Sequence, residues 1–141
     1  RLGGTAALAS IIGDDEADTL LDLLKSEGST NTVVVAIDDT GDEIFLDSSG
    51  FLTPSTLLHG TADGGVTAIK AAPSFFDATG MTVSQYFATS DDGTQVPYFV
   101  VGRRDCAPGP TLLGGYGGFE VAQTPGYGGV LGRLWLSRGG T

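Results

Sequence analysis

The 141-residue sequence predicts a mixed, β-rich fold built from two successive parts. Short β-branched and apolar runs are bounded by clusters of Gly, Asp, Asn, Ser and Thr, which indicates strands separated by turns. The pattern changes between Ala72 and Gly80, across a proline and a glycine. Most acidic residues lie between Asp14 and Asp47, whereas most basic residues follow from Arg103 onward. These observations divide the chain into residues 1–72 and residues 73–141.

The first part contains four short runs with strand character. Turn clusters follow the first run at residues 38–41 and the third run at residues 62–65. Short strands separated by turns at this spacing suit one blade of a β-propeller. The strands are expected at residues 33–37, 43–47, 56–59 and 66–70.

Residues 15–27 have the strongest helical pattern in the chain. Four apolar residues follow the i, i+3, i+4, i+7 spacing and therefore form one stripe on a helix. Acidic side chains crowd the first turn, where they complement the helix dipole, and Gly28 ends the helix. This helix does not fit a propeller blade, so we expect an insertion or a linker. The stripe consists of Ala17, Leu20, Leu21 and Leu24.

The second part begins with a predicted hairpin whose strands are residues 82–88 and 95–101. Asp92-Gly93 at its turn is typical of a hairpin, and Pro97 places the second strand at a sheet edge because proline has no N–H to donate. A buried strand at 111–115 and a helix at 128–138 follow. This order matches the opening of an α/β-hydrolase sheet. The helix is expected to turn Val130, Leu131, Leu134 and Trp135 inward.

The predicted strand at 111–115 leads into the loop Gly114-Gly115-Tyr116-Gly117-Gly118-Phe119. Glycine lets the backbone turn sharply and approach its neighbours closely. In open α/β sheets, ligands bind at the carboxyl ends of the strands, so the loop is a candidate site. Taken alone, the hexapeptide is more typical of a tight structural turn than of a ligand site. It matches neither phosphate-binding motif, G-x-G-x-x-G or G-x-x-x-x-G-K-[ST].

Three segments in order resemble the prolyl oligopeptidase family of serine peptidases. Ser90-Asp-Asp-Gly-Thr-Gln-Val-Pro-Tyr-Phe99 resembles the family's S-x-D-G-T-x-[IV]-P-x-F, and the loop resembles L-Y-G-Y-G-G-F. Thr124-Pro-Gly-Tyr127 resembles T-P-x-Y. The match is dense from about residue 43 onward. It departs at Gly114, where the family usually has a second tyrosine or another larger residue.

The resemblance implies a peptidase that cleaves short peptides through an acyl-enzyme. It implies that residues 1–72 are the C-terminal part of a β-propeller and that residues 73–141 begin the α/β-hydrolase catalytic domain, so the chain is expected to be an internal fragment. Tyr116 would be the oxyanion-hole donor, and Phe119 would line the S1 pocket. The alternatives are a buried, hydrogen-bonded aromatic at Tyr116 and a core residue at Phe119.

The chain has no recognisable nucleophile of its own. Ser137 does not stand in G-x-S-x-G, and His59, the single histidine, lies in the predicted propeller part. The catalytic serine, aspartate and histidine are expected outside these residues, and the chain alone is expected to be inactive. The alternative function is a truncated or pseudo-enzyme product that serves as a small β-rich binding or scaffolding module.

The net charge of −10 argues against nucleic acid or an anionic membrane surface as a partner. A short peptide and the remainder of the polypeptide are the expected partners. Cys106 is the single cysteine, which fits the cytosol or the periplasm, and we expect the cytoplasm. We expect neither a metal nor a cofactor: the acids at 14–18 suggest an EF-hand, but Thr19 and Lys25 occupy its glycine and glutamate positions.

Overall fold

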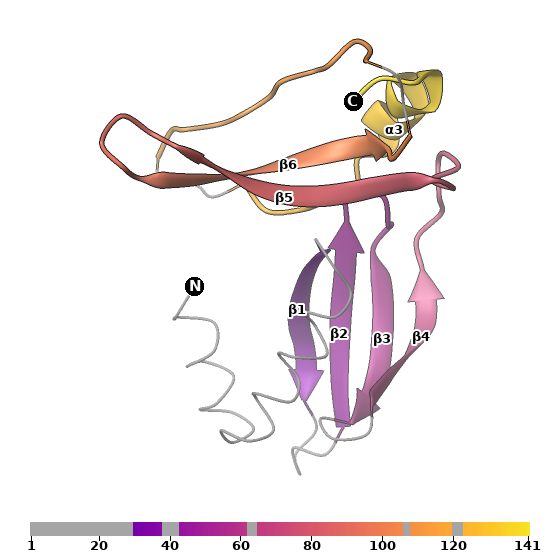
Figure 1. The fold of residues 1–141 in the computed structure, drawn as a ribbon. Coiled ribbons are helices and arrows are strands. Elements are labelled where there is room, and N and C mark those ends of the chain that lie inside the picture. Colours follow the sequence, from indigo (N-terminus) through magenta and orange to yellow (C-terminus); the bar gives the residue numbers. More distant parts are fainter. Residues whose placement is uncertain (1–29, 38–42, 62–64, 106–107, 120–122) are drawn as a thin grey trace.

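Two antiparallel sheets organise the chain. The computed structural model describes residues 30–37, 43–61, 65–105, 108–119 and 123–141. The first sheet has four strands in the order β1-β2-β3-β4, and the second is a two-stranded hairpin, β5-β6 (Figure 1). The strands are β1 (Thr30–Ile37), β2 (Glu43–Gly50), β3 (Thr56–Thr61), β4 (Gly65–Ala71), β5 (Met81–Thr89) and β6 (Gln95–Arg103).

All six strands observed were predicted, and each is longer than expected. The prediction fell short because residues such as Ser48 and Gly50 have weak strand propensity, yet pairing with a neighbouring strand extends β2 through them. The turn cluster at 38–41 and the helix predicted at 15–27 lie outside the described residues. So do residues 62–64 of the β3–β4 turn.

The four-stranded sheet buries alternate residues of its second strand. Ile44 and Leu46 are fully buried, and Phe45 between them lies on the opposite face, where its ring stacks on His59 of β3 at 4.5 Å. Successive side chains of a strand point to opposite faces. The alternation read from the sequence therefore sets which face of β2 becomes core.

The β5-β6 hairpin pairs without a register shift from Met81–Arg103 to Thr89–Gln95. Its turn closes as Asp92-Gly93 predicted: Gly93 has φ +85 and its N–H donates to the Ser90 carbonyl at 2.8 Å. Within the described residues β6 pairs only with β5. Pro97 thus lies on an edge strand, as predicted.

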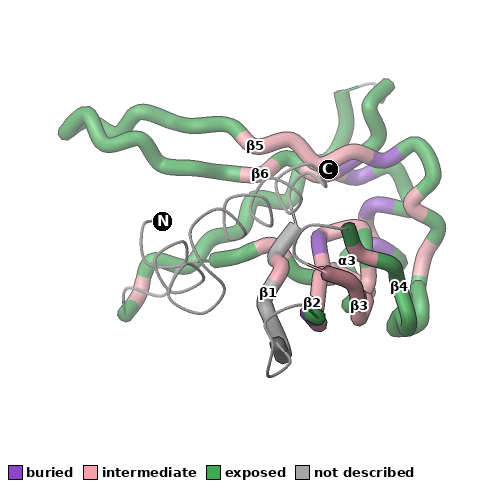
Figure 2. Tube along the Cα trace, turned by 90° about the horizontal axis from the view of Figure 1, so that it is seen from below, coloured by how far each residue is buried: buried purple, intermediate pink, exposed green. Residues whose placement is uncertain are grey.

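The hairpin runs across one end of the four-stranded sheet (Figure 1). At that junction the ring of Phe51, in the β2–β3 loop, lies 5.2 Å from the ring of Phe99 on β6. The N–H of Gly128 donates to the Phe51 carbonyl at 3.2 Å. Burial falls steeply toward the turn of the hairpin, which is exposed (Figure 2).

The helix predicted at 128–138 forms as two pieces, α3 (Gly129–Leu134) and the 3-10 turn η1 (Leu136–Arg138). Trp135 leaves the helical conformation between them, and Gly139 with φ +86 ends the second piece. The predicted inward face is right only in part. Val130, Leu131 and Leu134 are 72%, 52% and 56% exposed, whereas Trp135 is half-buried and Gly132 and Leu136 are buried.

The reason is a contact that lies far away in sequence. The ring of Phe76 occupies the space beside Gly132, where an added Cβ would lie only 2.0 Å from a ring carbon. The helix therefore packs through a glycine, and Val130 and Leu134 of the predicted stripe remain exposed.

The buried strand predicted at 111–115 is wrong. This segment is irregular, and Leu112 and Leu113 are 55% and 93% exposed. A strand requires a partner, and the partner here is one residue: Thr141 donates to the Pro110 carbonyl at 3.1 Å and accepts from the Leu112 N–H at 2.7 Å. Bonding to the residues on either side of Thr111 is the parallel pattern of strand pairing.

No helix among the residues the structure describes is long and apolar enough to cross a membrane.

Candidate functional site

The glycine-rich loop lies between β6 and α3 and is fixed near its start. Two backbone hydrogen bonds of Thr141, which follows η1, tie this residue to Pro110 and Leu112. Gly114, Gly115 and Gly117 have open space where a Cβ would stand. The loop is thus anchored at Leu112 and free of close backbone contacts at these three glycines.

Tyr116 projects from this loop and is 52% exposed. Its hydroxyl makes no hydrogen bond to another described residue, and the phenol lies against Gly118, 3.1 Å from the position of an added Cβ. Within the described residues, Tyr116 is therefore neither buried nor hydrogen-bonded through its hydroxyl.

Phe119 is 92% exposed and has φ +57, the one positive φ at a non-glycine residue in the described chain. Left-handed backbone costs an L-residue roughly 1–2 kcal/mol, and such strain clusters at functional sites. Within the described residues, Phe119 does not pack into a core. Both predicted site residues are exposed on the same loop.

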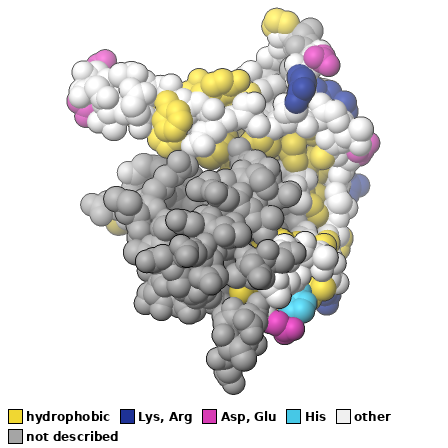
Figure 3. Space-filling view, turned by 60° about the horizontal axis from the view of Figure 1, so that its bottom comes forward, with side chains coloured by type: hydrophobic (Ala, Val, Ile, Leu, Met, Phe, Trp, Pro, Cys, Tyr) yellow, Lys and Arg dark blue, Asp and Glu magenta, His cyan; other side chains and the backbone are white. Residues whose placement is uncertain are grey.

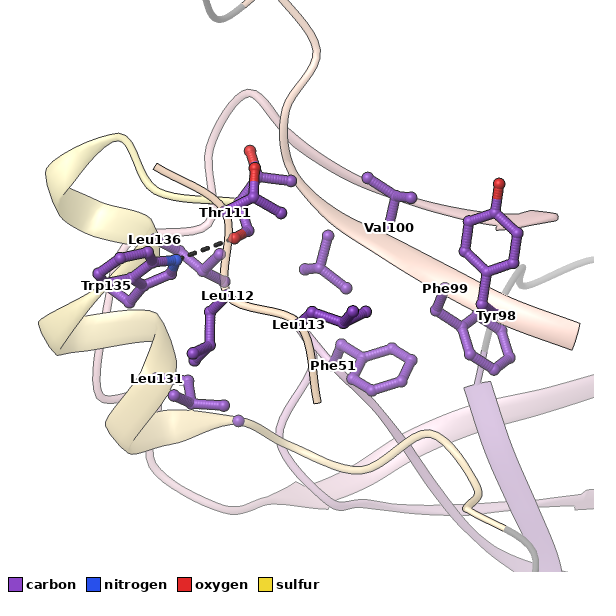
Figure 4. A pocket seen from close by; sticks show the side chains of 13 residues that line it. Phe51, Tyr98, Phe99, Val100, Thr111, Leu112, Leu113, Leu131, Trp135 and Leu136 are labelled. Atoms are coloured by element: carbon purple, nitrogen blue, oxygen red, sulfur yellow. Dashed lines mark hydrogen bonds between the residues drawn. The ribbon is translucent and has the colours of Figure 1, made fainter. Parts of the chain in front are cut away.

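An apolar cavity of about 320 Å³ lies beside the start of this loop (Figure 4). β6, the β2–β3 loop, the Leu112–Leu113 segment and α3 enclose it. Neither Tyr116 nor Phe119 lines it, so the cavity and the predicted site residues are separate features. The lining residues are Phe51, Tyr98, Phe99, Val100, Val101, Thr111, Leu112, Leu113, Gly128, Leu131, Trp135, Leu136 and Thr141.

One hydrogen bond joins two residues that line this cavity, Trp135 and Thr141. The indole Nε1 of Trp135 donates to the Thr141 carbonyl at 2.9 Å (Figure 4). A half-buried indole requires such a partner because its N–H is left unsatisfied otherwise. Sequence spacing had assigned Trp135 to an apolar helix face and gave no signal for this bond.

Tyr127, which follows the glycine-rich loop in the sequence, binds the connector between the two sheets, residues 72–80. Its hydroxyl accepts a hydrogen bond from the Phe75 N–H at 2.7 Å and lies 3.3 Å from the Ser74 hydroxyl. Its ring stacks on Phe76 at 5.5 Å with an interplanar angle of 7°. The T-P-x-Y motif marked this residue in the sequence, but no local pattern indicated its partners.

The connector also contains a self-closing turn. The Asp77 carboxylate accepts the Thr79 N–H at 2.9 Å, and the Arg103 guanidinium donates to the Thr79 carbonyl at 3.4 Å. The Thr79 hydroxyl and N–H, with a smaller contribution from Arg103, hold the pKa of Asp77 below its ordinary value. Asp77 is fully exposed, so we interpret it as part of the turn and not as an acid-base group.

His59 lies within β3, away from the loop. Its Nε2 is 3.6 Å from Glu43 Oε2, and Figure 3 shows the histidine beside an acidic side chain. The ring stacks on Phe45. Within the described residues, no group of three or more His, Cys, Asp or Glu side chains is arranged to hold a metal ion.

No model of a known protein family matches the chain. An uncharacterized peptidase of Sinorhizobium fredii is 49% identical over 107 residues, which are 73% of this chain and 15% of the relative. A prolyl endopeptidase of Elizabethkingia miricola is 27% identical over 138 residues, which are 95% of this chain and 19% of the relative. The chain thus spans less than a fifth of the length of these curated relatives.

The solved structures to which this chain is similar also include peptidases. One from a mechanistic study of two prolyl endopeptidases matches with a TM-score of 0.66 and 30% identity, over 77% of this chain and 16% of that one. Oligopeptidase B from Leishmania major matches with a TM-score of 0.64 and 25% identity, over 80% of this chain and 17% of that one.

The relatives and solved structures named above are peptidases by name. More specifically, the resemblance to the prolyl oligopeptidase family that the motifs predicted is confirmed, and the chain is related to prolyl endopeptidases and oligopeptidase B over part of their length.

Proposed function

We propose that the chain is the junction between propeller and hydrolase in a prolyl oligopeptidase-like serine peptidase. Residues 1–72 are then the C-terminal part of the β-propeller, and residues 73–141 begin the α/β-hydrolase catalytic domain. The antiparallel order β1-β2-β3-β4 supports the first assignment because a propeller blade is a four-stranded sheet of this kind.

The segment from Thr111 to Thr141 supports the second assignment. Its two ends pair in the parallel sense, and α3 lies between them. Parallel strands require such a crossover, which is usually a helix. This connectivity is compatible with the start of a β-α-β unit, the repeating element that we propose for the α/β-hydrolase sheet, although residues 111–115 do not themselves form a regular strand.

The proposed reaction is hydrolysis of a peptide bond in a short peptide. A serine hydroxyl adds to the carbonyl carbon, the amine leaves, and water releases the acyl group. The serine, aspartate and histidine are supplied by polypeptide outside these 141 residues, so the chain alone is inactive. The relatives' length supports this division, since the chain spans 15% and 19% of them.

Tyr116 supplies the hydrogen bond that stabilises the oxyanion formed in the addition step. The observation that carries this role is its accessible hydroxyl, which makes no hydrogen bond to another described residue and is presented from a loop anchored at Leu112. A donor that has no competing partner is available to the developing charge. Phe119, 92% exposed on the same loop, contributes an apolar wall to the S1 pocket.

The remainder of the polypeptide is the proposed partner of the outward apolar side chains. Leu113, Val130 and Leu134 are 93%, 72% and 56% exposed, and apolar patches of this kind mark surfaces that another element covers. The net charge of −10 disfavours nucleic acid and anionic membranes, and the enzyme is assigned to the cytoplasm.

The test has two stages. Reading the source gene beyond the codon for Thr141 should show an open frame with a G-x-S-x-G motif followed by an aspartate and a histidine. A stop codon soon after Thr141 would instead favour a non-catalytic binding or scaffolding module.

In the complete enzyme, Tyr116→Phe should then lower kcat by about 10²–10³ with little change in KM, because one oxyanion donor is lost. Tyr86→Phe is the matched control, since it removes a phenol hydroxyl from the exposed hairpin. Equal kcat for the Tyr116→Phe variant and the native enzyme would exclude the oxyanion role.

A further inference from the structure

The glycine at position 118 is not required by its backbone conformation. The glycines with positive φ in the described chain are Gly65, Gly80, Gly93 and Gly139, so Gly118 is not among them. The left-handed residue of this turn is Phe119, with φ +57. A side chain at position 118 would therefore be acceptable to the backbone, and the glycine has another cause.

That cause is the close approach of Tyr116. A Cβ on residue 118 would stand 3.1 Å from the Tyr116 hydroxyl oxygen, 3.2 Å from Cζ and 3.7 Å from Cε1. Ordinary van der Waals contacts of a Cβ begin at about 3.4 Å, so the first two are too short. The hydroxyl end of the phenol lies directly on the Gly118 backbone.

This contact affects where the hydroxyl can lie. No hydrogen bond to another described residue holds the Tyr116 side chain, and the residue is 52% exposed. The close approach to Gly118 is thus a contact through which residue 118 can influence the position of the hydroxyl oxygen. A methyl group at residue 118 would push that oxygen away from the backbone by a few tenths of an ångström.

We propose that Gly118 is a positioning residue for Tyr116: its missing side chain lets the phenol rest on the backbone and so fixes the height of the hydroxyl above the loop. This inference rests on the proposed oxyanion role of Tyr116. Stabilising a developing charge depends on donor placement, and a misplacement of about 1 Å can cost on the order of 10²-fold in rate.

Gly117 provides a matched control. It precedes Gly118 directly, also lacks a positive φ, and has no atom within 4 Å of an added Cβ. Gly117→Ala and Gly118→Ala therefore add the same methyl group to the same loop with the same effect on backbone entropy. They differ in whether that methyl group meets the phenol.

The experiment compares four variants of the complete peptidase by kcat and KM: Gly117→Ala, Gly118→Ala, Tyr116→Phe and Tyr116→Phe/Gly118→Ala. Gly118→Ala should lower kcat about ten-fold with KM nearly unchanged, and Gly117→Ala, whose methyl group does not meet the phenol, should lower kcat clearly less. The double variant should match Tyr116→Phe alone, because the methyl group acts only through the hydroxyl.

The outcomes separate the two proposals. If Tyr116→Phe lowers kcat but Gly118→Ala does not, or if the two losses multiply in the double variant, the positioning role is wrong and the oxyanion role survives. If Tyr116→Phe leaves kcat unchanged, the oxyanion role fails and the positioning role fails with it.

Thermal melting provides a readout that does not depend on activity. Tyr116→Ala removes both ring atoms that lie too close to the added Cβ, the oxygen at 3.1 Å and Cζ at 3.2 Å, so Gly118→Ala should lower the melting temperature less in the Tyr116→Ala background than in the native protein. An equal change in both backgrounds would show that the methyl group does not act through the phenol, and the proposal would be overturned.

Discussion

The four-stranded sheet and the segment that follows it are stabilised in different ways. In the sheet, alternate residues of β2 are fully buried, as Ile44 and Leu46 show. From the β5-β6 hairpin to Thr141, the buried apolar side chains among the described residues are Met81 and Leu136. That region is held instead by aromatic rings that pack on glycines, as Phe76 does on Gly132, and by hydrogen bonds of the backbone and of the Tyr127 hydroxyl.

The difference shows that strand content alone does not make a core. The hairpin has the longer ladder, nine unbroken residue pairs, yet Tyr86, Phe87 and Tyr98 on it are 49%, 55% and 45% exposed. Hydrogen-bonded pairing contributes little net free energy by comparison with removing apolar surface from water. A buried face requires a second layer, and the described residues supply little of one to the hairpin.

The largest expected effect comes from the same substitution made in both regions. Leu46→Ala should lower the free energy of unfolding of the 141-residue chain by about 2–5 kcal/mol, because it removes fully buried methyl groups and leaves a cavity. Leu113→Ala, at a residue 93% exposed, should change it by less than about 0.5 kcal/mol. Chemical denaturation measures both, and equal losses would contradict the contrast between the regions.

A smaller loss is expected at the helix. Gly132→Ala places a Cβ about 2.0 Å from the Phe76 ring, and overpacking of this kind costs about 1–3 kcal/mol. The better helix propensity of alanine offsets roughly 1 kcal/mol of that cost. Denaturation of Gly132→Ala should show net destabilisation, and adding Phe76→Leu should recover part of it. Stabilisation by Gly132→Ala would mean that the ring is free to move aside.

The hydrogen bond between the Phe75 N–H and the Tyr127 hydroxyl should contribute about 1 kcal/mol to the free energy of unfolding. Tyr127→Phe keeps the ring stacked on Phe76 but removes the acceptor of the Phe75 N–H, and one such hydrogen bond is worth about 1 kcal/mol. Hydrogen exchange at the Phe75 amide should become faster. Tyr98→Phe, on the exposed hairpin, is the control and should leave the exchange rate of that amide unchanged. An unchanged rate in both variants would show that the Tyr127 hydroxyl does not protect the Phe75 amide.

The smallest effect concerns pH. The pKa of Asp77 is lowered in the folded chain by the Thr79 hydroxyl and N–H, so its contribution to stability is present above the unfolded pKa of about 4 and is lost as pH falls through the folded pKa. The Thr79 amide shift should titrate in NMR with a midpoint below that of an unperturbed aspartate. Asp77→Asn should remove the titration; a midpoint at the ordinary value would show that the turn does not form in solution.

The sequence predicted the parts of this protein that depend on nearby residues. Strand positions follow from β-branched runs and the turns between them, and the hairpin turn follows from Asp92-Gly93 because glycine accepts the left-handed conformation without strain. The sequence also revealed the glycine-rich loop and the resemblance to the prolyl oligopeptidase family. The roles of Tyr116 and Phe119 remain predictions, as do the two domain assignments.

Tertiary structure decided which surfaces are covered. The apolar spacing of residues 128–138 indicated one inward face, but Phe76 packs on Gly132, and Val130 and Leu134 of that face are exposed. The apolar run at Leu112 and Leu113 indicated a buried strand, but pairing with Thr141 alone leaves it irregular and exposed. Tyr127 and Phe75 meet across 52 residues. Local sequence specifies backbone conformation through sterics and turn chemistry, whereas burial depends on segments that only the folded chain brings together.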